Sequence, residues 1–422
     1  MDAYGFIIGA SGIILLSFLF SQIARKTRIP AVLMLIGLGI GLQYLMRWAG
    51  FREINFFPAL EVLGIVGLIM IVLEAALELE LTRKKVPVIL KSAAVSALGL
   101  AVSVLAAALI IRVFHPGMHM SQAVLYATPL SILSSAIIIP SVSHMEEHQK
   151  EFLIYESTLS DILGIMLFYF IVGFLDPVSL KGPHPVTAFL GGFAITLVVS
   201  LIAGYFLIAI FQYISAGPKL FLLIAILLLL YAISKKAHLS PLIIILMFGL
   251  MVRNAPLFFR WGLQRFLIRE KFHDLEKGLH NLTMETAFVV RTFFFVIFGA
   301  SIALAGLLSI KVIVVSLVLL GSIYLVRFLV LALFLGKQVT PSVWVAPRGL
   351  ITVLLFYAIP EELTFPDFDS GILLFIILAS SVVMTLGMIY GKKPDTSGAN
   401  EDELIASTPD ADPGLALEEL DS

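Results

Sequence analysis

The sequence of 422 residues contains no cysteine and few charged residues, and both shortages narrow the class of protein. Without cysteine, the chain can form neither a disulfide framework nor a thiolate metal site. Charged side chains make up 14% of the residues and hydrophobic ones 59%, with a mean hydropathy of +1.03. Soluble domains carry about 25% charged residues. The composition therefore predicts a polytopic integral membrane protein.

Sequence motifs of soluble enzymes are missing as well. The chain has no glycine-rich phosphate loop, no histidine pair at metal-ligand spacing and no nucleophile triad. We therefore expect neither enzyme activity nor a bound cofactor. Residues 1–5 lack a basic region, and no small-residue cleavage site follows them. The first apolar run is therefore expected to be a retained helix and not a signal peptide.

Long apolar runs fill most of the chain. A helix that crosses a bilayer needs about 20 mainly apolar residues. Thirteen runs can be counted, at residues 4–22, 30–47, 57–79, 86–112, 122–143, 152–175, 186–212, 219–233, 240–252, 285–307, 310–335, 341–359 and 368–391. The sequence thus predicts an all-α polytopic membrane protein with about 13 transmembrane helices.

The distribution of Lys and Arg between the loops predicts how these helices are oriented. One side has the basic segments 25–28, 83–85, 253–277 and 392–393. Cytoplasmic loops carry the excess of positive charge, so this side is expected inside, with the N-terminus outside and the C-terminus in the cytoplasm. The lysine pair 235–236 lies on the other side and is the one signal against this orientation. We expect the protein in the cell membrane, that is, an inner or plasma membrane.

Two segments are expected to lie outside the bilayer core. Residues 253–284 place arginines among Phe and Leu, which favours an amphipathic linker helix at the cytoplasmic interface over a nucleic-acid site. Residues 393–422 hold nine acidic residues and, after Lys393, no Lys or Arg. This composition is typical of a disordered, solvated tail. The transmembrane domain is therefore expected to cover residues 1–392.

The fifth and twelfth runs contain proline and small polar residues near their middle. Residues 127–140 read ATPLSILSSAIIIP and residues 341–350 read PSVWVAPRGL. Proline inside a helix leaves backbone groups unpaired. Because the two runs are seven spans apart, they cross the membrane in opposite directions. Each proline alone is a tolerated kink, but paired interruptions in two inverted halves indicate the binding site of a transporter.

The sixth run, residues 152–175, contains Glu156 and Asp161. An aspartate at mid-membrane costs roughly 2.5–3.5 kcal/mol even on the lower scales, so such residues are typical of ion or proton pathways. In the predicted topology Asp161 lies at the depth of three serines of the fifth run, Ser131, Ser134 and Ser135. Carboxylate, hydroxyl and carbonyl oxygens suit a small cation. One group that binds either a proton or a cation is the minimum for antiport.

Glu156 is expected to have a different role from Asp161. The two are five residues apart, which is about 140° around an α-helix, so they face different neighbours. A buried charge is tolerated when it is paired, and the basic candidates are Arg327 and Arg348 in the eleventh and twelfth runs. We expect a structural Glu156–Arg327 pair, with Arg348 near the broken helices, where it offsets the half-helix ends. The alternative for each arginine is snorkelling to the headgroups.

At these residues the chain resembles the cation:proton antiporter superfamily, in particular the NhaP/NHE-type sodium–proton exchangers. The family's Glu-Ser-x-x-Asn-Asp motif is similar to residues 156–161, ESTLSD, except that Ser160 replaces Asn. The Arg-Gly at 348–349, Arg327 and the Leu-Glu-Ala-Ala run at 73–76 are similar to other family features in the same order. The resemblance implies an NhaA/NapA-like antiporter fold with inverted repeats and two broken crossing helices.

The resemblance also implies roles for individual residues. Asp161 would bind the transported cation or the proton, and Glu156 and Arg327 would form a structural pair. The further candidate ligands are Ser157, Ser160, Ser131, Ser134, Ser135 and Glu74, and Glu74 can instead line the cytoplasmic funnel. The family's Thr-Asp-Pro in span five has no clear counterpart, which leaves sodium or potassium selectivity open. A core with spans five, six and twelve would move against a scaffold that forms a homodimer.

The sequence thus predicts a secondary active monovalent cation/proton antiporter, with Na⁺ favoured over K⁺ and one cation exchanged per proton. Its expected partners are these ions and the lipid bilayer, with no nucleic acid. The nearest alternative is a K⁺/H⁺ antiporter or a K⁺ efflux pathway. A gated channel and an anion carrier that uses Arg348 are two further alternatives.

Overall fold

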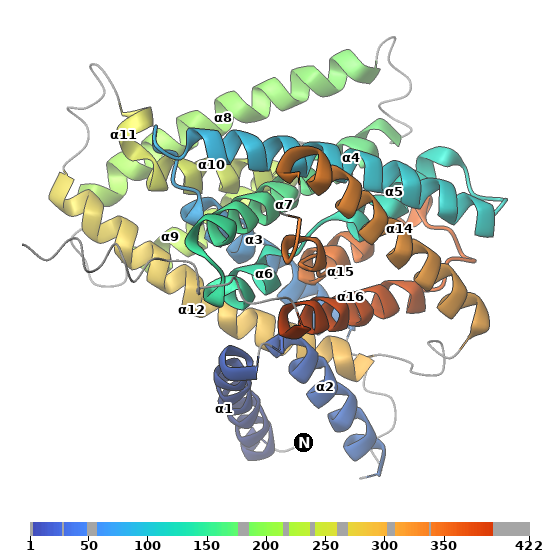
Figure 1. The fold of residues 1–422 in the computed structure, drawn as a ribbon. Helices are drawn as coiled ribbons and strands as arrows, with labels where there is room; N and C mark the ends of the chain where they lie inside the picture. Colours follow the sequence, from blue (N-terminus) through green and yellow to red (C-terminus); the bar gives the residue numbers. More distant parts are fainter. Residues whose placement is uncertain are drawn as a thin grey trace, which may run out of the picture.

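The computed structural model describes residues 3–27, 29–48, 57–175, 185–213, 219–236, 241–259, 269–301, 309–336 and 339–390. These ranges form α-helices and short 3₁₀ turns, joined by turns and extended links, and contain no strand (Figure 1). The all-helical membrane architecture is confirmed: within the described ranges, nine helices are long and apolar enough to cross a membrane. The acidic tail expected at residues 393–422 lies outside the described residues.

Each of the thirteen predicted spans corresponds to one helix or to one interrupted helix pair, in the predicted order. They are α1 (Ala3–Thr27), α2 (Ala31–Trp48), α3 (Phe57–Glu78), α4 (Val86–Phe114), α5 with α6 (Met120–Ser131, Ser135–Ser141), α7 (Glu147–Leu175), α8 (Pro185–Tyr213), α9 (Lys219–Lys236), α10 (Pro241–Arg253), α12 (Arg269–Ser301), α14 (Ile310–Leu335), η4 with α15 (Ser342–Trp344, Leu350–Tyr357) and α16 (Gly371–Tyr390).

The segment 253–284, expected to be an interfacial linker, is organised differently. The short helix α11 (Ala255–Phe258) follows α10 directly, and residues 260–268 lie outside the described residues. Helix α12 then runs without interruption from Arg269 to Ser301, and its part from Phe272 onward is apolar enough to cross a membrane. The second half of the expected linker and the tenth apolar run therefore form one continuous helix, and an interfacial position for its charged first part stays a prediction.

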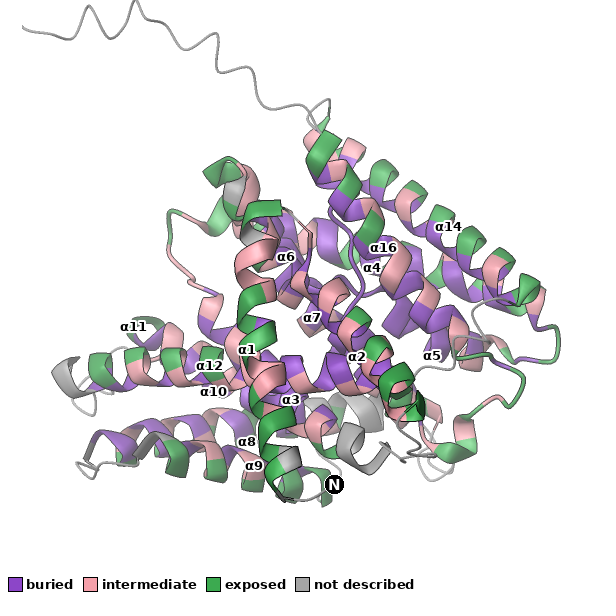
Figure 2. Cartoon of the chain, turned by 90° about the horizontal axis from the view of Figure 1, so that it is seen from below, coloured by how far each residue is buried: buried purple, intermediate pink, exposed green. Residues whose placement is uncertain are grey.

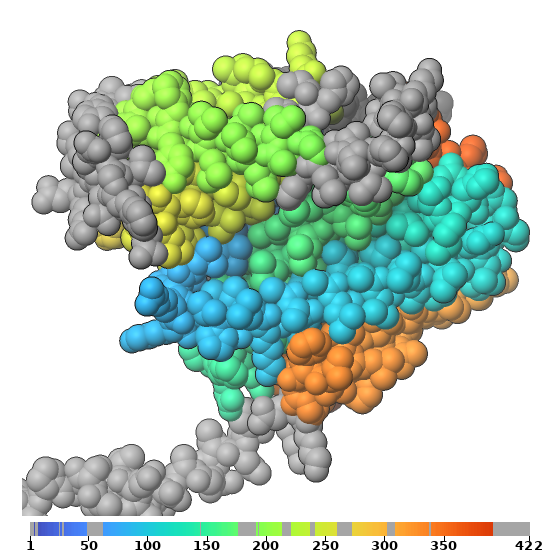
Figure 3. Space-filling view, turned by 90° about the horizontal axis from the view of Figure 1, so that it is seen from above, coloured from blue at the N-terminus to red at the C-terminus, as the bar shows by residue number. Residues whose placement is uncertain are grey.

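The helices form two bundles. The first, which we call the core, contains α4 to α7 and α14 to α16, and the second, which we call the scaffold, contains α1 to α3 and α8 to α12. Within the core, α4 packs against α5, α7 and α14; within the scaffold, α12 packs against α2 and α3, and α10 against α3 and α8. Figure 3 shows α4 and α5 (blue to cyan) bordered by α14 (orange) on one side and by α7 (green) on the other, with α8 (lighter green) beyond α7.

The outer faces of both bundles are apolar. Four large side chains, Leu325, Phe328, Leu329 and Leu333, follow one face of α14 and are 49–71% exposed. Figure 2 shows the same outward exposure along α14 and α1, whereas α5 to α7 are buried inside. A continuous exposed face of this kind favours contact with lipid, where each backbone group must be satisfied within the helix.

Two glycines allow α2 and α12 to approach each other closely. A Cβ at Gly39 would meet the Val296 carbonyl oxygen, and a Cβ at Gly299 would meet the backbone of Ile36. Backbone atoms cannot move away as a side chain can by changing its rotamer. A residue larger than glycine would therefore push the two helices apart. Close contact through small residues is the usual way in which membrane helices associate.

The alanine variants of Gly39 and Gly41 should therefore differ in stability. Gly39→Ala should destabilise the folded protein by about 1–3 kcal/mol, because overpacking forces the helices to separate. Gly41→Ala is the matched control on the same helix, since nothing lies within 4 Å of its Cβ position. Thermal unfolding of both variants in detergent would check this, and equal midpoints would contradict the close packing.

Candidate ion-binding site

The two broken helices cross inside the core. The helix of the fifth span is interrupted between Ser131 and Ser135, and the twelfth span between Trp344 and Leu350. The unwound stretches contact each other directly, since the Ser134 N–H donates to the Pro347 carbonyl at 3.0 Å. The side chain of Ser134 also occupies the space that a Cβ at position 349 would need, so the crossing requires glycine there. The predicted pair of crossing broken helices is thus confirmed.

Asp161 on α7 faces this crossing and is 2% exposed. Its Oδ2 accepts a hydrogen bond of 3.2 Å from the backbone N–H of Ser135, the first residue of α6. Its Oδ1 is buried and has no hydrogen-bond partner in the described part of the chain. Leaving a buried acceptor unsatisfied is unfavourable by about 1–3 kcal/mol, and more if it is charged. The free oxygen is therefore suited to a proton or to a cation with oxygen ligands.

Ser160, the residue before Asp161, supports the same unwound stretch. Its hydroxyl accepts a hydrogen bond of 3.1 Å from the N–H of Leu133. Adjacent residues of α7 therefore satisfy two backbone donors that the helix break has freed, those of Leu133 and Ser135. The hydroxyl at position 160 has this structural partner even though the resembling family has Asn there.

A related arrangement exists at the second break, and the sequence reasoning missed it. The hydroxyl of Ser380, on α16, accepts a hydrogen bond of 3.0 Å from the backbone N–H of Arg348. Spans six and thirteen are seven apart, like spans five and twelve, so each break receives a serine from the span that follows it. The sequence indicates such a partner by the serine pair 380–381 in the middle of an apolar run.

The other candidate hydroxyl ligands are buried but bonded locally. Ser131 donates to the carbonyl of Ala127 at 2.9 Å, and Ser157 donates to that of Ile154 at 3.1 Å. Both are at most 4% exposed. A hydroxyl oxygen keeps acceptor capacity while it donates, so neither bond prevents a role as ligand.

Glu156 and Arg327 form a bidentate ion pair inside the core. The two N–H···O distances are 2.8 and 3.2 Å, and the side chains are 3% and 7% exposed. The same guanidinium donates to the Ser342 carbonyl from Nε at 3.1 Å and from a terminal nitrogen at 2.9 Å. Arg327 therefore binds α7 and the broken twelfth span at once.

Arg348 lies at the crossing itself and is 2% exposed. Its Nε donates to the carbonyl of Leu130 at 2.7 Å, and a terminal nitrogen donates to that of Ala346 at 2.9 Å. Leu130 belongs to the last turn of α5, whose carbonyls have no partner in their own helix. The positive charge is therefore placed against the negative end of a half-helix.

The two carboxylates of α7 face two different cavities. Asp161 borders a narrow apolar cavity of about 10 Å³ between core and scaffold, which is lined by residues of α3, α7, α10 and α15: Ile71, Val72, Ala75, Ile162, Ile165, Met166, Leu242, Ile243, Leu246 and Ile351. Glu156 borders a cavity of about 30 Å³ within the core, together with Ser160, Arg327 and Arg348. The larger cavity has room for a water, which needs about 10–15 Å³.

Glu74 forms an ion pair between α3 and α12. Its carboxylate accepts a hydrogen bond of 3.0 Å from Arg291 of α12, and the two side chains are 16% and 19% exposed. In this structure α3 turns the Glu74 side chain towards α12, and its role as a cation ligand stays a prediction. The sequence reasoning missed Arg291, although an arginine inside the tenth apolar run was visible.

A buried carboxylate beside two crossed, interrupted helices defines a secondary transporter of small cations. The family model "Sodium/hydrogen exchanger, transmembrane" matches residues 13–390, and the chain therefore belongs to the sodium/hydrogen exchanger family. This is a family of transporters and not of enzymes.

Two solved structures share the fold. The sodium proton antiporter MjNhaP1 from Methanocaldococcus jannaschii at pH 8 has a TM-score of 0.65 and 20% sequence identity, with 92% of this chain and 96% of that chain covered. A 3D electron-microscopy map of the same antiporter has a TM-score of 0.61 and 20% identity, with 93% and 100% covered. Comparison with curated proteins finds no match.

The Glu156–Arg327 pair gives a test of stability. Glu156→Gln or Arg327→Gln should each destabilise the protein by about 3–5 kcal/mol, because a buried charge is left unpaired. The double variant should lose less than the sum of the two. Thermal unfolding in detergent would measure this, with Glu147→Gln as the control, since it breaks an exposed pair with Lys150. Additive losses would contradict the coupling.

Proposed function

We propose that the protein exchanges a monovalent cation, Na⁺ before K⁺, for a proton, and that both bind in turn to Asp161. The observation that carries this proposal is the buried Oδ1 of Asp161, which has no partner among the described residues and borders the boundary between core and scaffold. The protonated carboxylic acid and the cation-bound carboxylate both relieve this unsatisfied charge. Because the two forms exclude each other, one ion must leave before the other binds.

The surrounding charges favour one cation per proton. Glu156 and Arg327 neutralise each other, and Arg348 stays fixed against the α5 carbonyls. A single proton or a single monovalent cation on Asp161 therefore leaves the core with the same net charge. The desolvation penalty for moving the core across the membrane is then similar for both loaded forms. It would be larger for the empty site with an ionised Asp161. Exchange is electroneutral on this account.

Asp161 lies where a relative movement of the two bundles would change its access to water. The cavity it borders is lined by apolar side chains from both bundles, which exclude water from the site. We infer that the core carries the loaded site past the scaffold. Candidate ligands around the ion are the hydroxyls of Ser134, Ser135 and Ser157, together with carbonyls that the helix breaks have freed. We further propose a homodimer formed through the scaffold, with the C-terminus in the cytoplasm of the cell.

Replacing the aspartate should abolish exchange. In proteoliposomes that hold a pH indicator, an inward Na⁺ gradient should drive a pH change with the parent protein and none above the empty-liposome level with Asp161→Asn. Asp274→Asn is the matched control, because this exposed aspartate lies on α12 in the scaffold. Undiminished exchange by Asp161→Asn would overturn the proposal, and parallel runs with Li⁺ and K⁺ determine the selectivity.

Competition for one carboxylate also predicts a pH dependence of apparent affinity. Where the proton dominates the site, lowering the pH by one unit should raise the KM for Na⁺ about tenfold, with the maximal rate at saturating Na⁺ little changed, because a single proton must be displaced. Initial rates across a range of Na⁺ concentrations at several pH values would measure this. A KM independent of pH would indicate separate proton and cation sites.

A further inference from the structure

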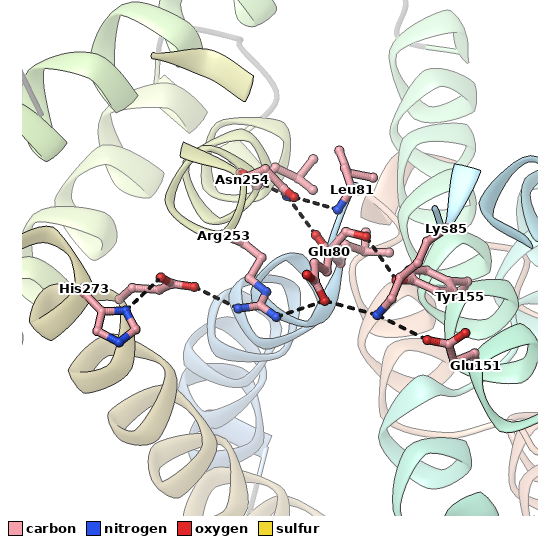
Figure 4. A network of polar contacts seen from close by, with 11 residues as sticks. Glu80, Leu81, Lys85, Glu151, Tyr155, Arg253, Asn254 and His273 are labelled. Carbon is pink, nitrogen blue, oxygen red and sulfur yellow. Dashed lines mark hydrogen bonds and ion pairs between the residues drawn. The ribbon is translucent and has the colours of Figure 1, made fainter. Parts of the chain in front are cut away.

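The connection between α3 and α4 is the place where the chain first passes from the scaffold to the core. A network of polar contacts surrounds it, and the ion site makes no use of this network (Figure 4). Its members come from the end of α3, the start of α4, the first turns of α7, the α10–α11 junction and α12. A movement of the core against the scaffold must act on this connection.

The scaffold holds the first part of the connection through Asn254. The side-chain nitrogen of Asn254 donates to the Leu79 carbonyl at 2.8 Å, and its oxygen accepts from the Leu81 N–H at 2.6 Å. Asn254 is 5% exposed, so these bonds are protected from water. Residues 79–81 are thereby attached to the α10–α11 junction as if they were part of the scaffold.

The core holds the second part through Lys85 and Tyr155. Lys85 immediately precedes α4, and its ammonium pairs with Glu151 of α7 at 3.2 Å. The Tyr155 hydroxyl, one turn further along α7, donates to the Glu80 carbonyl at 3.1 Å. Burial opposes the charge of Lys85, but its hydrogen bonds with Glu80 and Glu151 outweigh this and raise its pKa, so that it stays charged.

The Glu80 carboxylate joins the two parts. Its Oε2 lies 3.1 Å from the Lys85 ammonium on the core side and 3.5 Å from the Arg253 guanidinium on the scaffold side. Arg253 continues the network to Glu276 of α12 at 2.8 Å. The Glu80 carboxylate therefore links a basic residue of each bundle. The backbone carbonyl of Glu80 in addition accepts a hydrogen bond from Tyr155 of the core.

We propose that Glu80 is a positioning residue that latches the core to the scaffold at this rim and thereby sets how readily the transporter leaves the present conformation. The proposal rests on the alternating access inferred above. The ion pairs involve side chains that are 31–38% exposed, and such pairs are weak enough to break and re-form in each cycle. Losing a contact that exists in only one conformation shifts the population away from it.

The absence of cysteine makes a direct test simple, because two introduced cysteines are the only labelling sites. Ser143→Cys places a spin label on the core beside the start of α7, and Lys277→Cys places one on the scaffold beside Glu276. Distance distributions between the labels are then measured in lipid nanodiscs for the parent, Glu80→Gln and Glu147→Gln. The last variant is the matched control, since its 3.1 Å pair with Lys150 lies within α7 alone.

Glu80→Gln should raise the population of a longer distance between the labels about three- to tenfold, whereas Glu147→Gln should leave the distribution unchanged. In transport assays Glu80→Gln should change the maximal rate but not the KM for Na⁺, and Glu80→Asp should restore much of the parent behaviour. Arg253→Gln should produce the same shift in distance and add little to it in combination with Glu80→Gln.

The latch is overturned if Glu80→Gln and Arg253→Gln both keep the parent distance distribution, or if Glu147→Gln shifts it equally. Thermal unfolding identifies any variant that does not fold, and Lys85→Gln then provides the same comparison. The distance measurement does not depend on which ions are exchanged. A protein that transports no Na⁺ but still shifts its distances would therefore contradict the proposed function and leave the latch intact.

Discussion

The rest of the structure depends on how backbone groups are satisfied where two helices are interrupted inside the membrane. Lipid offers no hydrogen bonds, so each freed N–H and C=O must find a partner within the protein. The protein supplies Ser160 and Asp161 to the first break, Ser380 to the second, and the Arg348 guanidinium to the end of α5. The carboxylate that we propose to bind the ion thus also holds the helix break in place.

The two carboxylates of α7 have different surroundings and therefore different roles. Glu156 faces the interior of the core, where Arg327 neutralises it and ties α7 to the carbonyl of Ser342 in the twelfth span. Asp161 faces the boundary with the scaffold, where it borders an apolar cavity and its Oδ1 has no described hydrogen-bond partner. The paired group contributes rigidity to the core, and the unpaired group remains available for an ion.

The boundary between core and scaffold has two kinds of contact. Around Asp161 the contact is apolar, which excludes water and offers little resistance to sliding. At the rim, where α3 ends, it is polar and concentrated around Glu80. In the movement that we propose, the apolar centre would slide while the polar rim would favour particular end positions. Glu74, a candidate ligand from the sequence, pairs with Arg291 of the scaffold in this structure.

The sequence by itself determined the class of membrane protein, the order of the helices, and which polar residues and prolines lie inside apolar runs. Periodicity and length predict the spans, and a carboxylate or proline in an apolar run is identifiable because the bilayer penalises it. Partners could not be read in the same way, because a buried charge can pair with any opposite charge at its depth. The pairing of Glu156 with Arg327 followed from scarcity, since few buried cations were available. Three features were decided only by the tertiary structure, because they depend on how each helix is rotated about its axis against its neighbours. They are the pairing of Glu74 with Arg291, the contact of Ser380 with the second break, and the convergence of Lys85, Tyr155 and Arg253 on Glu80.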